Sequence, residues 1–246
     1  MGNHYNKTLE YYSYWTEVKV NYFDKKEIIF KKSNNRNIKQ EGYPSIYNGY
    51  VYINNYNLIF SYGDKIEKYI PLIKEKINNE NILQVLEDFC IGNLSICKKF
   101  YYSEEMFFDN DEAVLLGERN LIDFINFIKD ANCLHNDINT DWIKDYFYQN
   151  LRSQSLWAIY KDNKIVSCTE KPDIPYLNNI IVEPGINTLQ EYRKNNYAKK
   201  VLSKFIKNII NNGQTPIWSC GKNNIASEKL AKSLGFKELS EVILIT

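Results

Sequence analysis

The segment Thr188-Leu-Gln-Glu-Tyr-Arg-Lys-Asn-Asn-Tyr-Ala198 joins an extended apolar run to an amphipathic helix. The run covers residues 178–187, and the helix is predicted to begin near Asn196 and to stop at Gly213. The apolar pairs that recur every four residues in this helix are Tyr197/Ala198, Val201/Leu202, Phe205/Ile206 and Ile209/Ile210. A turn at a helix N-terminus offers backbone N–H groups to anions. The segment therefore predicts a site for a phosphate-bearing ligand.

Composition describes an ordinary globular chain. The sequence has 246 residues, 44% hydrophobic and 25% charged, which suits one large domain or two small ones. The net charge is +1, so we expect neither nucleic acid nor an anionic membrane as a partner. No run of 18 apolar residues occurs and the N-terminus lacks a signal-peptide core, which predicts a cytoplasmic protein without a membrane span.

The cysteines give no sign of a metal site or of a disulfide framework. Their number is odd and their spacing is irregular, and only His4 and His135 could complete a ligand set. We therefore expect reduced thiols and no bound metal. The five residues are Cys90, Cys97, Cys133, Cys168 and Cys220.

Element patterns divide the chain into two predicted domains, residues 1–108 and 109–246. The first is predicted to be an accessory α+β domain with a hairpin over residues 50–60, turning at Asn54-Asn55. It also has helical stretches at residues 65–77 and 82–89. The elements expected in the second domain are strand 113–116, helices 118–130 and 141–151, hairpin 155–160/164–168, strand 179–188, a helix from 196, strand 215–220, helix 224–234 and strand 242–246.

Two of these helices have predicted inner faces. In the helix over residues 118–130, the apolar face consists of Leu121, Ile122, Ile125 and Ile128. In the helix over residues 141–151, capped by Asn139 or Thr140, the inward residues are Trp142, Ile143, Tyr146 and Phe147.

Three motifs follow one another in the second domain: Glu183-Pro-Gly-Ile-Asn-Thr188, then Arg193-Lys-Asn-Asn-Tyr-Ala198, then Asn224-Ile-Ala-Ser227 with Leu234-Gly-Phe236. In this order they resemble the GNAT superfamily of acetyl-CoA-dependent N-acyltransferases. The resemblance implies an α+β fold in which helices flank a mixed sheet with a splayed central strand pair. It also implies that acetyl passes from acetyl-CoA, as co-substrate, to a primary amine of a small molecule or protein by direct attack.

The resemblance also implies which residues contact the coenzyme. Arg193 and Lys194 would add positive charge, and the pyrophosphate would lie on the backbone N–H groups of Lys194, Asn195, Asn196, Tyr197 and Ala198. Ile186 and Thr188 would pair with the pantetheine arm, and Asn224 would hydrogen-bond to it, with Ser227 one turn further on. The alternatives are a basic turn that only leads into a packed helix, and an Asn224 that serves as a helix N-cap.

Pro184-Gly185 interrupts the β-type run, which predicts a bulge or splay, or else a strand-ending turn. Glu183, beside it, is the candidate general base, acting through water. The alternative is an exposed strand glutamate. Glu170, Asp173 and Tyr192 are further candidates for the base.

The sequence departs from the family pattern at two positions. Asn196 stands where glycine is usual, and Ala231 stands where a tyrosine often acts as general acid. These departures leave open a catalytically weak GNAT-like module that binds CoA or a protein partner. Two further possibilities are open. The protein could form a homodimer, and the first domain could be a degenerate copy of the second.

Overall fold

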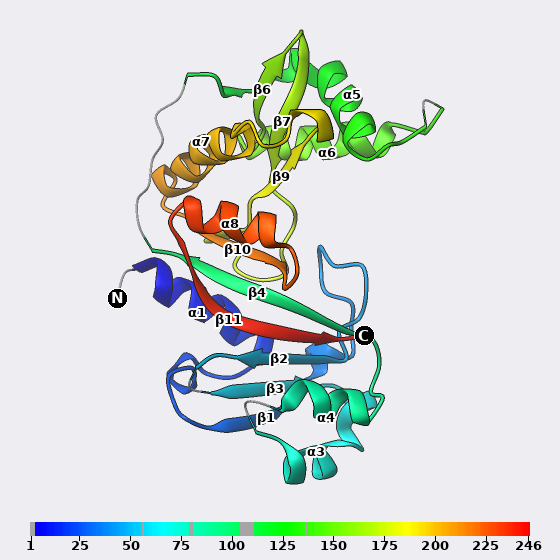
Figure 1. The fold of residues 1–246 in the computed structure, drawn as a ribbon, viewed down its shortest axis with the longest axis vertical. Coiled ribbons are helices and arrows are strands. Elements are labelled where there is room, and N and C mark those ends of the chain that lie inside the picture. Colours follow the sequence, from blue (N-terminus) through cyan, green and yellow to red (C-terminus); the bar gives the residue numbers. More distant parts are fainter. Residues whose placement is uncertain (1–2, 56, 79–80, 104–110, 136) are drawn as a thin grey trace. The chain divides into compact units, whose positions relative to one another are not determined.

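The computed structural model describes residues 3–55, 57–78, 81–103, 111–135 and 137–246 (Figure 1). The chain contains two compact units, which we call the terminal unit and the middle unit. The terminal unit consists of residues 1–103, 173–181 and 217–246, and the middle unit of residues 104–172 and 182–216. The predicted boundary between residues 108 and 109 lies outside the described residues.

The terminal unit is built on a mixed sheet with the strand order β1-β3-β2-β11-β4-β10-β8, all of it within this unit except Val182, Thr215 and Pro216. The predicted hairpin is confirmed, since β2 and β3 are antiparallel from Gly49↔Tyr62 to Ile53↔Leu58. The strands are β1 (Ile28–Lys32), β2 (Gly49–Ile53), β3 (Leu58–Tyr62), β4 (Leu94–Tyr102), β8 (Ile181–Val182), β10 (Thr215–Gly221) and β11 (Phe236–Ile245). All neighbours with a described register are antiparallel except β1 and β3, which are parallel.

The last strand, β11, joins the N-terminal strands to the rest of this sheet. It pairs with β4 from Phe236↔Tyr102 to Ile245↔Leu94, and with β2 from Glu241↔Ile53 onward. The C-terminal residues therefore pack with residues 1–103. The predicted strand 242–246 covers only the last four residues of β11 and extends one residue beyond its end.

Helices cover both faces of the terminal sheet. Because side chains alternate along a strand, Tyr50 and Tyr52 pack with Trp15 of α1 on one face, and Val51 packs beneath α2–α4 on the other. The helices are α1 (Asn3–Thr16), α2 (Asp64–Glu67), α3 (Ile70–Lys76), α4 (Ile82–Asp88) and α8 (Ile225–Ser233), with 3₁₀ turns η1 (Val20–Tyr22) and η2 (Asn34–Arg36).

The middle unit is an antiparallel sheet with the order β5-β6-β7-β9. Asp162 and Asn163 join β6 to β7 with φ of 50° and 59°, as the tight hairpin turn requires. The elements are β5 (Val114–Leu115), η3 (Glu118–Asn120), α5 (Leu121–Ala131), α6 (Asp141–Arg152), β6 (Trp157–Lys161), β7 (Lys164–Glu170), β9 (Gly185–Thr188), η4 (Gln190–Tyr192) and α7 (Tyr197–Asn211).

Alternate residues of β6 separate the two cores of the middle unit. Ala158 packs with α5 and α6, whereas Ile159 packs with Val201 of α7. The buried face of α7 agrees with its predicted period. Two predicted inner positions are wrong: Ile122 is 65% exposed and Trp142 is 49% exposed.

Phenylalanines outside the predicted inner face of α5 lie in the core in place of Ile122. Phe124 and Phe127 of α5 are buried, with Phe147 of α6 opposite them.

Within the part of the chain that is described, no helix is both long and apolar enough to span a bilayer.

Candidate functional site

The turn between η4 and α7 presents a row of backbone donors. The sign of φ alternates along it, since Lys194 has a φ of 67° and Asn196 a φ of 61°, with a residue of negative φ between them. No hydrogen bond within the described ranges takes up the backbone N–H groups of residues 194–198. Residues 193–196 are exposed. Consecutive N–H groups in such a turn, at the positive end of a helix dipole, form an anion-binding concavity.

Asn196 occupies the N-cap position of α7, at the point where the GNAT pattern that the sequence resembles has glycine. Its backbone is left-handed, with φ 61° and ψ 10°, and its side chain makes no capping hydrogen bond. Asparagine enters this region more readily than most residues. The turn therefore keeps a backbone that glycine would favour, although the side-chain cap expected of asparagine is not formed.

Hydrogen bonds within the turn fix its course. The amide of Asn195 donates from Nδ2 to the carbonyls of Tyr192 (3.2 Å) and Arg193 (3.3 Å). Arg193 donates from Nε to the carbonyl of Thr188, at 3.1 Å, which ties the turn to the end of β9.

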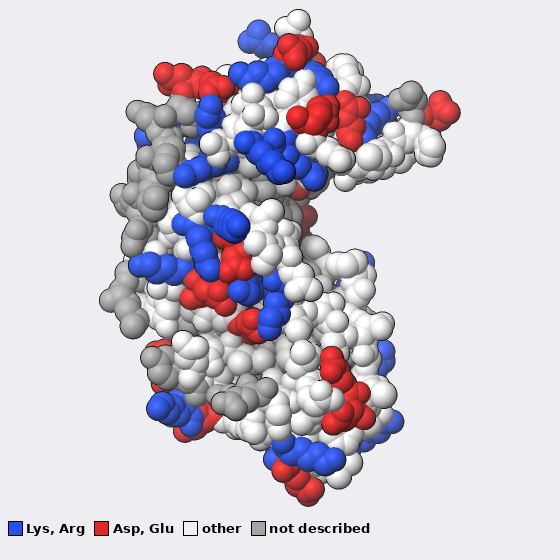
Figure 2. All heavy atoms as spheres, in the orientation of Figure 1, with Lys and Arg blue, Asp and Glu red and all other residues white. Residues whose placement is uncertain are grey.

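The basic side chains around the turn differ in how much positive charge they can offer to a ligand. Lys200 and Lys161 both bind Glu112 and hold the pKa of that carboxyl below its usual range, so their charge is partly neutralised. Arg193 and Lys194 are exposed on the turn itself. On the face drawn in Figure 2, basic and acidic atoms are interspersed, in keeping with the small net charge. The positive charge at the turn therefore comes from Arg193 and Lys194 and not from a broad basic surface.

Strand β9 leaves one of its edges open in the sheet of the middle unit. It is the last strand in the order, and Leu189 donates its N–H to Val166 of β7. In an antiparallel pair alternate residues point their backbone groups at the partner. The N–H groups of Ile186 and Thr188 therefore point away from β7. The carbonyl of Thr188 accepts from Arg193, so its N–H is the group left for a ligand.

The predicted interruption at Pro184 separates β8 from β9. β8 belongs to the seven-stranded sheet and β9 to the four-stranded sheet, so the chain changes sheets here. Pro184 is buried and Glu183 is half-buried. The assignment of Glu183 as general base stays a prediction.

A second carboxylate, Glu170, faces a cavity of 380 Å³ on the α5/α6 side of the middle unit. Tyr146 donates from its hydroxyl to Glu170 Oε2 at 3.0 Å. Burial raises the pKa of the Glu170 carboxyl, and the bond from Tyr146 opposes this in part. The lining residues are Ile128, Asn132, Leu134, Trp142, Tyr146, Glu170 and Asn187.

Gly185 allows the Glu170 side chain to lie across β9. The two residues are paired in register, and a Cβ atom at residue 185 would lie 2.5 Å from Cγ and 2.9 Å from Oε1 of Glu170. Any larger residue would displace this side chain. The Pro-Gly signal thus has a second role that the sequence did not reveal.

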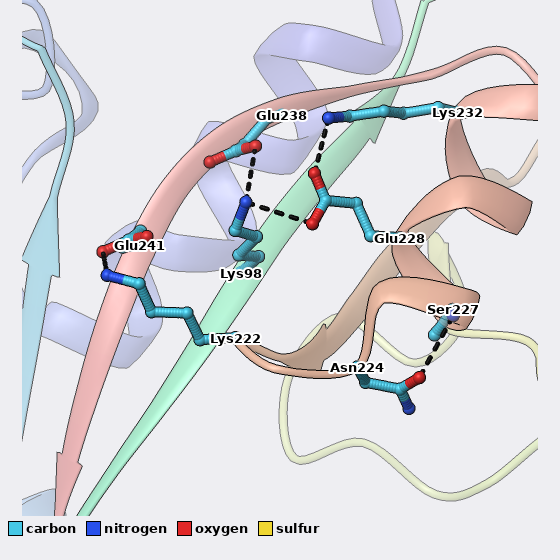
Figure 3. Close-up of polar contacts among 8 residues, drawn as sticks. All are labelled: Lys98, Lys222, Asn224, Ser227, Glu228, Lys232, Glu238 and Glu241. Carbon is cyan, nitrogen blue, oxygen red and sulfur yellow. Dashed lines mark hydrogen bonds and ion pairs between the residues drawn. The ribbon is translucent and has the colours of Figure 1, made fainter.

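The third motif lies in the terminal unit, at the start of α8 (Figure 3). Asn224 Oδ1 accepts from the backbone N–H of Ser227 at 3.1 Å, so the N-cap alternative is confirmed. Ser227 Oγ in turn accepts from Trp218 Nε1 at 3.1 Å. The cap occupies the oxygen of Asn224 only, which leaves its amide nitrogen for the predicted contact with a ligand.

An ion-pair cluster holds α8 against the sheet (Figure 3). Lys98 on β4 lies 3.1 Å from Glu228 of α8 and 3.4 Å from Glu238 of β11, and Glu228 also binds Lys232. The two carboxylates raise the pKa of Lys98. Glu228 is one turn beyond Asn224, so the cluster positions the cap.

Comparison with known proteins identifies the fold. A family model described as GNAT acetyltransferase matches residues 77–244. The chain belongs to the GNAT acetyltransferase family. The match includes β9, the turn before α7, and α8. The family resemblance and the fold class predicted from the motifs are thus confirmed.

Individual relatives are more distant. The uncharacterized N-acetyltransferase YdfB of Bacillus subtilis (strain 168) is 37% identical over 86 residues, which cover 35% of this chain and 31% of that protein. The match therefore spans about a third of that relative's length. An acetyltransferase from the GNAT family from Colwellia psychrerythraea superposes with a TM-score of 0.54 at 16% identity and covers 80% of each chain.

The structure places the predicted residues in two groups. Ile186, Thr188 and residues 193–198 lie on β9 and the turn of the middle unit, whereas Asn224 and Ser227 lie in the terminal unit. Ala231 is fully buried and offers no acid.

The sequence reasoning missed Trp142 as a cavity residue, since helical spacing alone assigned it to the core. Among the described residues, no three His, Cys, Asp or Glu side chains form a metal-binding group.

Proposed function

We propose that the protein moves an acetyl group from acetyl-CoA to the primary amine of a small molecule or protein. The observation that carries this proposal is the turn at the start of α7, a helix of 15 residues, where residues 194–196 are exposed and the backbone N–H groups of residues 194–198 have no acceptor within the described chain. Donors of this kind suit a diphosphate. Membership of the GNAT family supports acetyl-CoA as its source.

The reaction needs a polarised carbonyl and two proton transfers. The amine nitrogen attacks the thioester carbon, the C–S bond breaks, and the thiolate leaves. In the proposed arrangement Ile186 donates its outward N–H to the carbonyl oxygen, as oxyanion donors do. Glu183 accepts the amine proton through water. Because Ala231 carries no acid, the thiolate takes its proton from water or from another group.

The test combines calorimetry with a release assay. Acetyl-CoA binding is measured first, and release of free thiol is then followed with a panel of primary amines. The proposal predicts saturable binding and thiol release that depends on the amine. Failure of acetyl-CoA to bind would overturn it.

The alternative is a catalytically weak GNAT-like module that binds CoA or a protein partner. The observation in its favour is Ala231, which is fully buried where the family often has a tyrosine acid. Binding of acetyl-CoA with thiol release no faster than its slow hydrolysis, across the whole amine panel, would favour the module over the enzyme.

A further inference from the structure

The cavity beside Glu170 has the composition of a site for a small organic amine. Ile128, Leu134 and Trp142 supply apolar wall, and Trp142 is 49% exposed although it stands on a packed helix. A volume of 380 Å³ lies at the small end of the range, about 300–1,000 Å³, that ligand pockets occupy. A few polar groups on an apolar wall are the usual means of orienting a ligand.

Glu170 is the one charged side chain among the seven that line this cavity. Tyr146 donates to Oε2, and the side chain of Glu170 lies against Gly185 of β9. No described cation pairs with Glu170. A buried carboxylate with a single neutral donor gains from a cationic or hydrogen-bond-donating partner. Asn132 and Asn187 add amide groups at the wall.

The position of the cavity on β9 connects it with the proposed reaction. Asn187 lines it, and the preceding residue of the strand, Ile186, carries the outward N–H assigned to the thioester carbonyl. Side chains stand roughly perpendicular to a sheet, whereas backbone N–H groups lie in its plane. The cavity on the face of β9 and the open edge of β9 are therefore adjacent without overlapping.

We propose that this cavity binds the acceptor as a primary amine carried on a compact apolar body, with the amine on Glu170 and the body against Trp142. The identification of this amine as the acetyl acceptor rests on the proposed function. The binding of an amine in the cavity is independent of that function. Long polar polyamines and large polycationic sugars do not match the single carboxylate and the apolar wall.

The binding test uses 2-phenylethylamine and its alcohol counterpart, 2-phenylethanol, measured by calorimetry on the whole chain without acetyl-CoA. We expect the amine to bind about 10- to 100-fold more tightly than the alcohol, because a charge-assisted bond is lost in the alcohol. Glu170→Gln should remove this preference, and Trp142→Leu should weaken both compounds. Glu118→Gln, at an exposed position of η3, is the matched control.

A second variant keeps the carboxylate but moves it. Gly185→Ala places a methyl group where the Glu170 side chain now lies, so the amine should bind more weakly although no charge is removed. Equal affinity for amine and alcohol in the unmodified protein, or an unchanged preference in Glu170→Gln, would overturn the assignment.

Transfer assays separate this inference from the proposed function. If acetyl-CoA fails to bind while 2-phenylethylamine still depends on Glu170, the enzyme proposal fails and the amine site stands. If thiol release with amines proceeds at an unchanged rate and KM in Glu170→Gln, the enzyme proposal stands and the cavity is not the acceptor site.

Discussion

Replacing Asn196 by valine or by glycine tests whether the left-handed backbone at this position matters for the turn. Asn196 has a φ of 61°, and its side chain makes no capping hydrogen bond. Both replacements remove the amide group, but only valine opposes the backbone conformation. The comparison therefore isolates the backbone from the side chain.

The size of the effect follows from the conformational preference. A left-handed backbone costs an L-residue about 1–2 kcal/mol, and a β-branched residue is especially ill suited to it. If the valine variant keeps the turn, the free energy of unfolding falls by about 1–2 kcal/mol. If the free turn relaxes instead, recovering the binding conformation raises the Kd for acetyl-CoA about 5- to 30-fold.

The assay pairs calorimetry with acetyl-CoA and urea unfolding on the same three proteins. The glycine variant should bind at least as tightly as the parent, because glycine adopts positive φ without penalty. The valine variant should have a lower free energy of unfolding, a weaker free energy of acetyl-CoA binding, or both. The two losses together should amount to about 1–2 kcal/mol. Parental stability together with parental affinity in the valine variant would refute the reasoning.

Four further changes test other parts of the account. Arg193→Ala should weaken acetyl-CoA binding about three- to tenfold, whereas Arg152→Ala, on the helix of the opposite face, should leave it unchanged; equal effects would show a nonspecific charge contribution. Glu183→Gln should lower kcat about 100-fold or more with little change in the KM for acetyl-CoA, and parental turnover would remove Glu183 as the base. Lys98→Met should lower the free energy of unfolding by about 1–2 kcal/mol, because Glu238 loses its cation and Glu228 keeps only Lys232, as urea titration would show; no change would contradict the positioning role. Glu170→Gln should change the pH dependence of stability, because burial raises the pKa of Glu170 and the folded protein loses stability as pH rises from the ordinary carboxyl pKa toward the raised one. The stability of the Glu170→Gln variant relative to that of the parent should therefore rise with pH over that interval. A difference in stability that does not change with pH would contradict the burial.

Local patterns predicted the elements that surround the turn well. The four-residue period of α7, the Asp162-Asn163 hairpin and the cap at Asn224 are all set by neighbours in sequence, and the structure contains each of them. Asn196 was placed at the start of its helix for the same reason. Its left-handed backbone was not predicted, since that depends on the path of the whole turn.

Elements fixed by distant partners were harder to predict. Lys98 and Lys99 interrupt the apolar character of β4, yet this strand lies between β10 and β11 and is held by pairing on both sides. β11 joins β2 and β4 across most of the chain length, and no local period encodes such a register. The Glu170 cavity was missed for a similar reason, because α5 and the residues after it, α6, β7 and β9 form it together.

The most direct measurement of the central claim is a titration of isotope-labelled protein with acetyl-CoA, observed through the amide resonances of residues 194–198. These amide resonances should move downfield together and saturate with the calorimetric Kd, since each N–H that binds a phosphate oxygen is deshielded. Binding of acetyl-CoA that leaves all five amides in place would contradict the claim.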